Sequence, residues 1–442
     1  MATASSSQSF SRRGFLGLTA GATSAVLLAA CTSTPSKASA GTMKFWNMPW
    51  GGVAFTPLDK KISLGYKPKA GLPQVTYQSI PWSGFTQTFA SAVASATGPA
   101  VSSGGGTQAF QFAAEGKIAY ADDLVESWKK NGLYDDFLPG LIDTMKTKDG
   151  YAAVPYALDL RVMWYNKVLL EKAGVNPPAD WQSYLDACAA LKKNNVYGFG
   201  VSGGPGMGGQ ILTGIMINNG GGLFDEEQQP NCVTSANIDA INWVLEMVAK
   251  GYSDPASVSY TTANSYAQWK ARKFGMGWDN NTGSVSVGGD VQNEMEVGAP
   301  LTSSSGKQGA INFIANMMMY KNTPSQEGSE AFLTYYYQHM SPLWTKKTGI
   351  GLPVLKSITA TPEFKSSPSN VKIIDEWLPV AKTLGAPGNK GLFVNAVAVD
   401  STQPLTIFAE TVLGGKTDAK TALTTLQSGI KKIVESTTSK KK

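Results

Sequence analysis

The stretch "GYAAVPYALDLRVMWYNKVLLEKAG", residues 150–174, has the pattern of a buried strand that runs directly into a helix. Side chains of a strand point alternately to its two faces. One face is entirely apolar and consists of Leu158, Leu160, Val162 and Trp164. The other face carries Asp159 and Arg161, only two residues apart. We expect these two charges either to brace each other or to meet a ligand.

The N-terminus has the pattern of an export signal. Arg12 and Arg13 precede an apolar stretch at 14–30, which is at the short end for spanning a bilayer and resembles a twin-arginine signal. The stretch ends in "LAAC", which resembles the lipobox of bacterial lipoproteins, where cleavage leaves a lipid-bearing cysteine, here Cys31. We therefore expect an export signal at 1–30, a flexible tether, and attachment to the extracellular face of the cell membrane. An uncleaved membrane anchor is the alternative.

Charge and cysteine content argue against several classes of protein. Without the signal the chain has 36 basic and 32 acidic residues, so its charge is close to neutral and we expect no nucleic-acid partner. With one histidine and no cysteine pair at zinc-site spacing, we expect no metal and no cofactor. In an exported protein Cys188 and Cys232 can form a disulfide or remain buried thiols.

Two glycine-rich motifs suggest enzymes. "GVSGG", 200–204, matches a nucleophile elbow around Ser202, but the only histidine, His339, lies near the end of a predicted helix. "GPGMGG", 204–209, matches the dinucleotide fingerprint, yet its acidic partner is poorly placed. We interpret this loop as backbone N–H groups that face a ligand hydroxyl or anion. A glycoside hydrolase with two carboxylates stays open as an alternative.

Strands and helices are predicted to alternate along the chain, which is typical of α/β proteins with helices covering parallel sheets. A chain of about four hundred residues also predicts two lobes. The predicted strands are 42–48, 74–80 and 196–203, the segment 97–110 is predicted as a loop, and the main predicted helices are 57–66, 84–96, 176–195, 235–251, 329–340 and 417–435.

Tryptophans follow several predicted strands in polar surroundings. Trp50 lies after the first strand, Trp82 after the second, and Trp278 directly before Asp279. Aromatic rings cover the apolar faces of sugars, and polar side chains bond their hydroxyls. Because open α/β sheets bind ligands beyond the carboxyl ends of their strands, this pattern predicts a carbohydrate site.

The opening stretch, continued through "VNPPADW", resembles the signature of family 1 extracellular solute-binding proteins, the sugar receptors of ABC importers, which include maltose-binding protein. "FGMGWDN", "TGIGLPVLKS" and "IFAETVLGGKTDAKTALTTLQSGI" resemble further segments of that family. The resemblance implies a two-lobed periplasmic-binding-protein-like fold, each lobe a mostly parallel sheet flanked by helices, joined by crossing hinge strands. It implies a monomer that captures a di- or oligosaccharide in the cleft and delivers it to the permease subunits. A receptor of the same fold for another solute, such as glycerol phosphate, is the alternative.

The resemblance also implies boundaries and site residues. The implied N-terminal lobe is 43–156 with 313–357, the C-terminal lobe is 157–312 with 358–436, and a basic tail follows at 437–442. The implied substrate contacts are Asn47, Trp50, Thr107, Gln108, Asp159, Arg161, Trp278 and Asn395, to which the polar and aromatic pattern adds Trp82 and Asp279. The chain departs from the family at Ala100, where relatives carry an aspartate, and at 104–106, where glycines replace an aromatic residue. One stacking surface is thereby lost, so the sugar need not be maltose.

Overall fold

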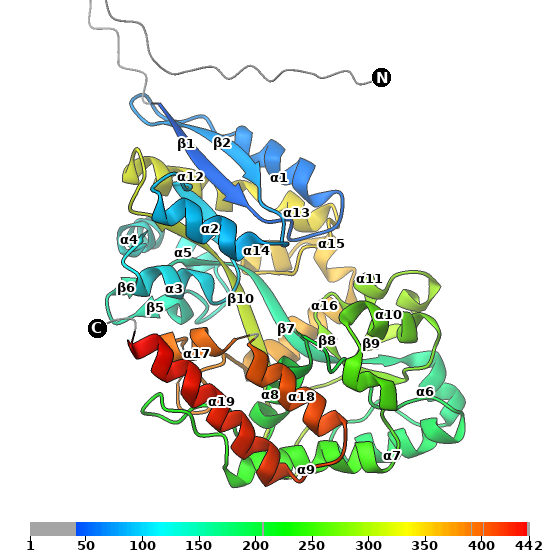
Figure 1. Cartoon of the computed structure of the whole chain (residues 1–442). Helices are drawn as coiled ribbons and strands as arrows, with labels where there is room; N and C mark the ends of the chain where they lie inside the picture. Colours follow the sequence, from blue (N-terminus) through cyan, green and yellow to red (C-terminus); the bar gives the residue numbers. More distant parts are fainter. Residues whose placement is uncertain (1–40, 206, 390, 401, 440–442) are drawn as a thin grey trace, which may run out of the picture. The chain divides into compact units, whose positions relative to one another are not determined.

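The stretch quoted above folds as a 13-residue strand, β7 (Val154–Asn166), followed directly by the helix α6 (Lys167–Ala173) (Figure 1). The Asn166 side chain begins the helix by accepting a hydrogen bond from the Leu169 N–H. Gly174, with a φ of 70°, ends it. The structure is a computed structural model that describes residues 41–205, 207–389, 391–400 and 402–439.

β7 changes its neighbouring strands halfway along its length. Its first half, up to Leu160, pairs antiparallel with β10 and β11, and its second half pairs antiparallel with β8 and β9. These partners are β8 (Met276–Asn280), β9 (Met295–Val297), β10 (Ala310–Tyr320) and β11 (Leu352–Pro353). Asp159, next to this change, is the one residue of β7 that is not buried. The predicted lobe boundaries at 156/157 and 312/313 fall inside β7 and β10 and stay a prediction.

Parallel pairing is concentrated in the part of the sheet farthest from β7. β2 (Gln74–Ser79), β1 (Thr42–Asn47) and β3 (Val101–Gly104) pair in parallel, and β10 pairs in parallel with the short β12 (Ala381–Lys382). The sheet order continues from β3 through β10 and β7 to β11 by antiparallel pairing. The α/β class is therefore as predicted, but the sheet is mixed rather than mostly parallel, because β7 and β10 run against each other and β10 runs against β3.

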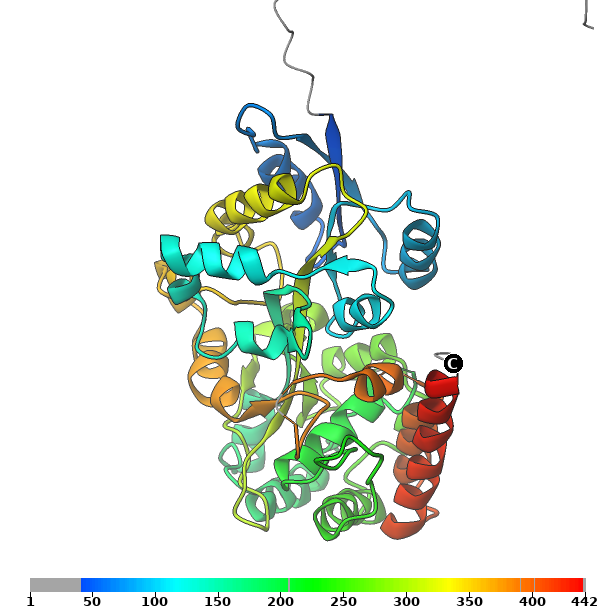
Figure 2. The same cartoon turned by 90° about the vertical axis from the view of Figure 1, so that its left-hand side faces the viewer.

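The longer helices pack in two groups that do not follow their order along the chain, because α12, which comes after β7, packs with α1 and α4, which come before it. α1 packs against β2 and α12, whereas α8 packs against β10, α9 and α18, with α19 outside them (Figures 1 and 2). The longer helices are α1 (Phe55–Leu64), α2 (Phe85–Ala94), α4 (Asp122–Asn131), α7 (Trp181–Lys193), α8 (Met207–Asn218), α9 (Ser235–Ala249), α10 (Thr262–Lys270), α12 (Gln326–His339), α18 (Gln403–Leu413) and α19 (Ala419–Ser439). The main predicted helices are confirmed, with ends that differ by a few residues.

Short elements complete the described chain. The short helices are α3 (Gln108–Ala114), α5 (Leu133–Asp136), α11 (Gly283–Val287), α13 (Pro342–Thr345), α14 (Lys356–Thr359), α15 (Pro362–Lys365), α16 (Pro368–Lys372) and α17 (Val394–Val399). The short strands are β4 (Ile118–Ala119), which pairs with β10, and the hairpin β5 (Lys146–Thr147) with β6 (Gly150–Tyr151). Single turns of 3-10 or π helix lie at Ile142–Met145, Pro255–Ser259, Asp290–Asn293, Ile373–Trp377 and Leu378–Val380.

Two predicted elements are wrong. The strand predicted at 196–203 forms only isolated bridges, one of which joins Gly200 to Gly277. The loop predicted at 97–110 contains β3 and the start of α3. β3 has the sequence Val-Ser-Ser-Gly, which lacks the apolar alternation of a typical strand. Its two serines can be buried because both are hydrogen-bonded. Ser102 Oγ lies 3.0 Å from the Tyr320 hydroxyl, and Ser103 Oγ accepts from the Met48 N–H at 3.1 Å.

The predicted export signal, including Arg12 and Arg13, and the predicted lipidation site Cys31 lie outside the described residues. Within the described ranges, none of the helices combines the length and the apolar character that crossing a bilayer needs. Cys188 and Cys232 are both buried free thiols, so the second of the two alternatives for these cysteines holds.

Candidate ligand-binding site

Arg161 is a buried brace for Asp159. Its Nη1 donates to Asp159 Oδ1 at 2.5 Å, and its Nε and Nη2 donate to Gln210 Oε1 at 3.2 and 2.8 Å. The guanidinium carbon lies 4.9 Å from the centre of the Phe313 ring, which suits a cation–π contact. The side chain of Arg161 is 7% exposed and that of Asp159 is 41% exposed. Asp159 is therefore the group presented to solvent, and Arg161 holds it in place.

Gln210 reaches Arg161 because glycines let the first turn of α8 pack closely. A Cβ on Gly208 would lie 2.4 Å from the Ser202 carbonyl oxygen, and one on Gly209 would lie 2.7 Å from the Leu405 Cβ in α18. Close packing against neighbouring backbone thus accounts for two glycines of the "GPGMGG" motif. Gln210 Nε2 also lies 3.3 Å from Asp400 Oδ1, so this side chain connects β7 to the segment before α18.

The serine-hydrolase alternative finds no support in the positions of its residues. Ser202 is buried. His339 is exposed, stacks on Tyr335 with ring centres 4.1 Å apart, and has its Nδ1 2.7 Å from the Tyr335 carbonyl oxygen. Ser202 lies in the loop before α8 and His339 is the last residue of α12, and none of the described hydrogen bonds joins the two side chains.

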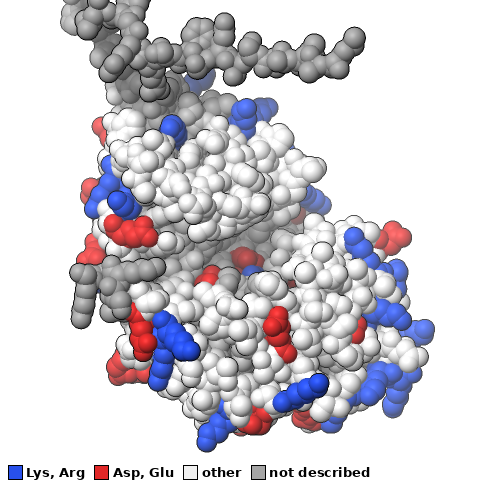
Figure 3. All heavy atoms as spheres, viewed as in Figure 1, with Lys and Arg blue, Asp and Glu red and all other residues white. Residues whose placement is uncertain are grey.

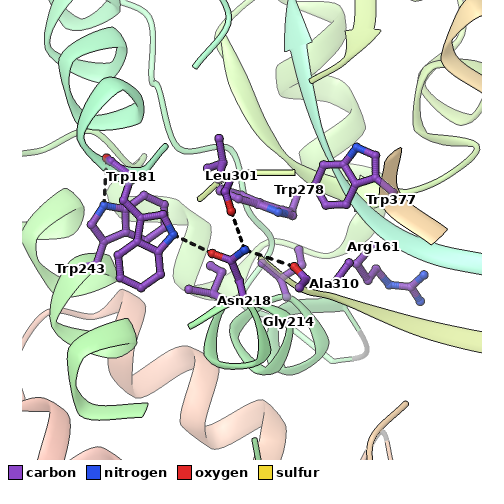
Figure 4. A pocket seen from close by; sticks show the side chains of 12 residues that line it. Arg161, Trp181, Gly214, Asn218, Trp243, Trp278, Leu301, Ala310 and Trp377 are labelled. Atoms are coloured by element: carbon purple, nitrogen blue, oxygen red, sulfur yellow. Dashed lines mark hydrogen bonds between the residues drawn. The ribbon is translucent and has the colours of Figure 1, made fainter. Parts of the chain in front are cut away.

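Trp278 and Asp279 lie on β8 beside the second half of β7. Trp278 is half-buried and packs against Tyr184, with ring centres 5.1 Å apart, and against Trp243 at 6.1 Å. The cavity that it lines with Trp181, Trp243 and Trp377 holds only about 10 Å³, roughly one water molecule, and cannot hold a sugar ring. Figure 4 shows the Arg161 side chain pointing away from these tryptophans. The packed side of Trp278 is therefore structural.

Asp279 is a buried carboxylate next to Arg161. It is 3% exposed, and its Oδ1 accepts from the Asn280 N–H at 2.7 Å and lies 3.4 Å from the Tyr266 hydroxyl. Burial raises the pKa of Asp279 to about 6, against the lowering effects of the Asn280 N–H and the Arg161 charge. Asp279 is thus shielded from solvent and acts on Arg161 and Asp159 through its charge.

Asn47, Trp50 and Trp82 form one connected unit after β1. Asn47 is completely buried; its Nδ2 donates to Asp59 Oδ2 at 2.7 Å, and its Oδ1 accepts from Trp50 Nε1 at 3.1 Å. Trp50 Nε1 also lies 2.9 Å from Ser103 Oγ. The Trp50 ring meets the Trp82 ring edge to face at 4.8 Å and 87°, and Trp82 is 41% exposed. Asn47, predicted as a ligand contact, is instead enclosed by protein, because its amide nitrogen donates to the Asp59 carboxylate of α1.

The loop after β3 carries an amide side chain without a partner. Gln108 is 8% exposed, and neither of its amide atoms bonds another described protein group. A Cβ on Gly104 would lie 2.2 Å from Met318 Cε and 3.0 Å from Asn316 Oδ1, so a larger residue here would force the end of the buried Met318 side chain to move. Gly106 lies against Phe313, the ring on which Arg161 stacks, and the half-buried Thr107 precedes α3.

Asn395 lines a different cavity. This cavity of about 600 Å³ lies between α3, the β5–β6 hairpin and residues 389 and 391–395, with Lys146, Lys148 and Phe393 also in its wall. The Asn395 amide donates to the Gln228 carbonyl oxygen at 3.1 Å. No described contact joins Asn395 to Asp159 or Arg161, so the predicted site residues do not all come together.

Several residues of the site were absent from the sequence prediction. Phe313 and Gln210 contact Arg161, Tyr266 contacts Asp279, and Asp400 contacts Gln210, but the sequence around them gives no functional signal. The exception is Gln210, which directly follows the glycine motif. Figure 3 shows a hollow over the crossing of β7 and β10, with acidic and basic atoms side by side on its floor and mostly uncharged side chains around it.

Comparisons with known proteins agree with this architecture. Residues 67–340 match the family of bacterial extracellular solute-binding proteins. A sugar transporter of Arthrobacter chlorophenolicus A6, in a structure described with bound laminaribiose, is 46% identical, with a TM-score of 0.80 over 89% of this chain and 99% of that chain. The maltose-bound MalE3 of T. maritima is 16% identical and has the same fold, with a TM-score of 0.70 over 88% of this chain and 99% of its own.

A binding protein of Brucella abortus is 24% identical over 274 residues, which span 60% of this chain and 64% of the relative. The structural matches confirm the two-lobed periplasmic-binding-protein-like fold that the sequence predicts. The family match covers well over half of the chain, from residue 67, before β2, to residue 340, after α12. This chain therefore belongs to the family of bacterial extracellular solute-binding proteins.

Proposed function

We propose that the protein captures a di- or oligosaccharide at the crossing of β7 and delivers it to the permease subunits of an ABC importer. The observation that carries the proposal is Asp159, the one residue of β7 that is not buried, held in place by a buried arginine. A carboxylate that accepts from a sugar hydroxyl contributes about 1.5–3 kcal/mol when solvent is excluded. As a member of a solute-binding family, the protein is expected to release its ligand unchanged.

Three further groups support a carbohydrate as the ligand. Trp82 offers an exposed ring that Trp50 backs from the other side. Gln108 offers a donor and an acceptor that the protein leaves unpartnered, and Thr107 lies beside it. The exposed part of Trp278 completes the set, whereas Asn47 and Arg161 act by holding Trp50 and Asp159. An aromatic surface with a few oriented polar groups is the usual chemistry of sugar recognition.

Laminaribiose is the first ligand to test, because it is bound in the 46% identical relative. Calorimetric titration of the exported chain is expected to give one-to-one binding, and chromatography of the sugar afterwards is expected to return it intact. Asp159→Asn should weaken binding about 10- to 100-fold. Asp186→Asn, an equal charge change at an exposed position of α7, serves as the control. Released glucose, or unchanged affinity in Asp159→Asn, would contradict the proposal.

We further propose that the chain is exported through its Arg12–Arg13 signal and attached to the outer face of the cell membrane through a lipid on Cys31. The support is the sequence pattern alone. Cys31→Ser is expected to move the protein from the membrane fraction to the soluble one, and Arg12→Lys with Arg13→Lys is expected to block export. Gel filtration of the variant lacking the lipid site is expected to give a monomer.

A further inference from the structure

The charged groups at the crossing of β7 do not balance. Arg161 is flanked by two carboxylates, Asp159 on its own strand and Asp279 on β8. Asp279 interacts electrostatically with both of them, and Arg161 is the cation that acts on Asp279 and on the neighbouring Tyr266. Two carboxylates and one guanidinium leave this group of three residues, which we call the hinge triad, with a net negative charge.

Arg161 is not positioned to receive an anion. Each of its three nitrogen atoms donates to a protein oxygen, its guanidinium stacks on Phe313, and its side chain is 7% exposed. Asp159 is the member of the triad that a ligand reaches first, at 41% exposure. A ligand carboxylate or phosphate would therefore meet a carboxylate and would have to displace Asp159 or Gln210 to reach the arginine.

We propose that the hinge triad makes this site selective for uncharged carbohydrates and against acidic ones, with Arg161 as a positioning residue for Asp159. The inference rests on the proposed function and adds the charge class of the ligand. Sugar phosphates, glycerol phosphate and saccharides that contain uronic acids are rejected, because a like charge close to Asp159 is repelled in surroundings of reduced dielectric. The selectivity is thus set by repulsion rather than by an additional attractive contact.

The rejection has a pH dependence that geometry and charge predict together. Burial raises the pKa of Asp279 to about 6, so Asp279 is ionised near neutral pH and largely protonated one unit below that value. The titratable and charged groups that face it are Asp159 and Arg161 on β7 and Tyr266 on α10. Protonation of Asp279 removes one negative charge from the triad, so the penalty on acidic sugars decreases as the pH falls.

The test is a calorimetric comparison of laminaribiose with the matched disaccharide whose terminal C6 alcohol is oxidised to a carboxylate, together with sn-glycerol 3-phosphate. At about pH 7 and low salt we expect the acidic disaccharide to bind at least about tenfold more weakly than laminaribiose. This ratio should shrink at about pH 5 and at high ionic strength. Tight binding of laminaribiose with equal or tighter binding of the acidic disaccharide overturns the charge inference and leaves the proposed function standing. The absence of any sugar binding, with or without binding of glycerol phosphate, overturns both the charge inference and the proposed function.

Variants separate the charge from the fold. Asp279→Asn, which keeps the size of the side chain, should reduce the affinity ratio between the two disaccharides and remove its pH dependence. Asp186→Asn on the exposed face of α7 should leave the ratio unchanged. Arg161→Gln should weaken laminaribiose, because Asp159 loses its brace, and should weaken the acidic disaccharide still more, because the triad loses its one positive charge. A wild-type affinity ratio in Asp279→Asn, with its pH dependence intact, would overturn the assignment; if Arg161→Gln does not fold, Asp279→Asn alone decides.

Discussion

The amide nitrogen of Asn47 lies 2.7 Å from a carboxylate oxygen of Asp59, and neither residue has exposed surface. Tyr336 donates to the other oxygen of the same carboxylate at 2.5 Å, and the oxygen of the Asn47 amide accepts from the Trp50 indole. A carboxylate inside the protein therefore orients, through one amide, the ring that backs the exposed Trp82.

Asp59→Asn is expected to change how stability depends on pH. Burial raises the pKa of Asp59 to about 6, against the lowering effect of the Tyr336 hydrogen bond. The unfolded-state pKa of an aspartate is about 3.9, so between about pH 4 and 6 the folded protein binds more protons and the free energy of unfolding falls as pH rises. Asp279 contributes in the same window, so the variant should lose about half of this slope.

Urea unfolding at several pH values across that window measures the slope. At about pH 7 the variant should also lose roughly 1–3 kcal/mol, because an amide nitrogen replaces one acceptor in a buried network. Asp186→Asn, at an exposed carboxylate, should keep the wild-type slope. An unchanged slope in Asp59→Asn would show that this carboxylate does not carry the pH dependence.

Trp82→Ala and Trp278→Ala are expected to separate binding from folding. Trp82 is 41% exposed, so its removal should lower laminaribiose affinity about tenfold with little loss of stability. Trp278 packs against Tyr184 and Trp243, so its removal should lower the free energy of unfolding by about 3–5 kcal/mol. Titration and thermal unfolding of both variants give the comparison. Wild-type affinity in Trp82→Ala would remove this ring from the site.

Gly104→Ala is expected to disturb the loop that presents Gln108, whereas Gly105→Ala is its matched control. A Cβ at Gly104 would meet the buried Met318 and Asn316, but one at Gly105 meets nothing within 4 Å. Gly104→Ala should cost about 1–3 kcal/mol of stability and weaken sugar binding, since the added atom overpacks the base of the loop. Equal effects of the two substitutions, measured by unfolding and titration, would contradict this reading of the loop.

The most regular patterns of the sequence predicted the fold best. β1, β2, β7 and the main helices carry clear periodicity and caps, so local physics was enough to predict them. β3 was missed because Ser102 and Ser103 are buried by hydrogen bonds to residues far away in the sequence. The alternation of strands and helices along the chain also predicted mostly parallel sheets, because nothing in the local sequence indicates whether β7 and β10 run parallel or antiparallel to their neighbours.

The pairing of Asp159 with Arg161 could be predicted from the sequence, whereas the surroundings of each residue could not. Alternation along β7 placed Asp159 and Arg161 on one face, and the structure pairs them. Which of the two remains accessible depends on Gln210 and Phe313, which come from α8 and β10. Asn47 was predicted as a ligand contact because it follows the first strand in a segment that resembles a ligand-facing loop of the family, and nothing in the sequence indicates its contact with Asp59, twelve residues later in α1. Segments far away in the sequence bury Arg161 and Asn47 and thereby decide their roles, and the local sequence pattern does not show this burial.

The two buried thiols make the protein suitable as an optical sugar sensor. Burial raises the pKa of Cys188 well above its usual value and that of Cys232 to about 12, so neither provides a reactive thiolate at neutral pH. In a chain without Cys31, a cysteine introduced at Val53, which is 99% exposed in the loop after Trp50, would be the one thiol open to maleimide dyes. A fluorophore could then be attached at that position without removal of Cys188 or Cys232.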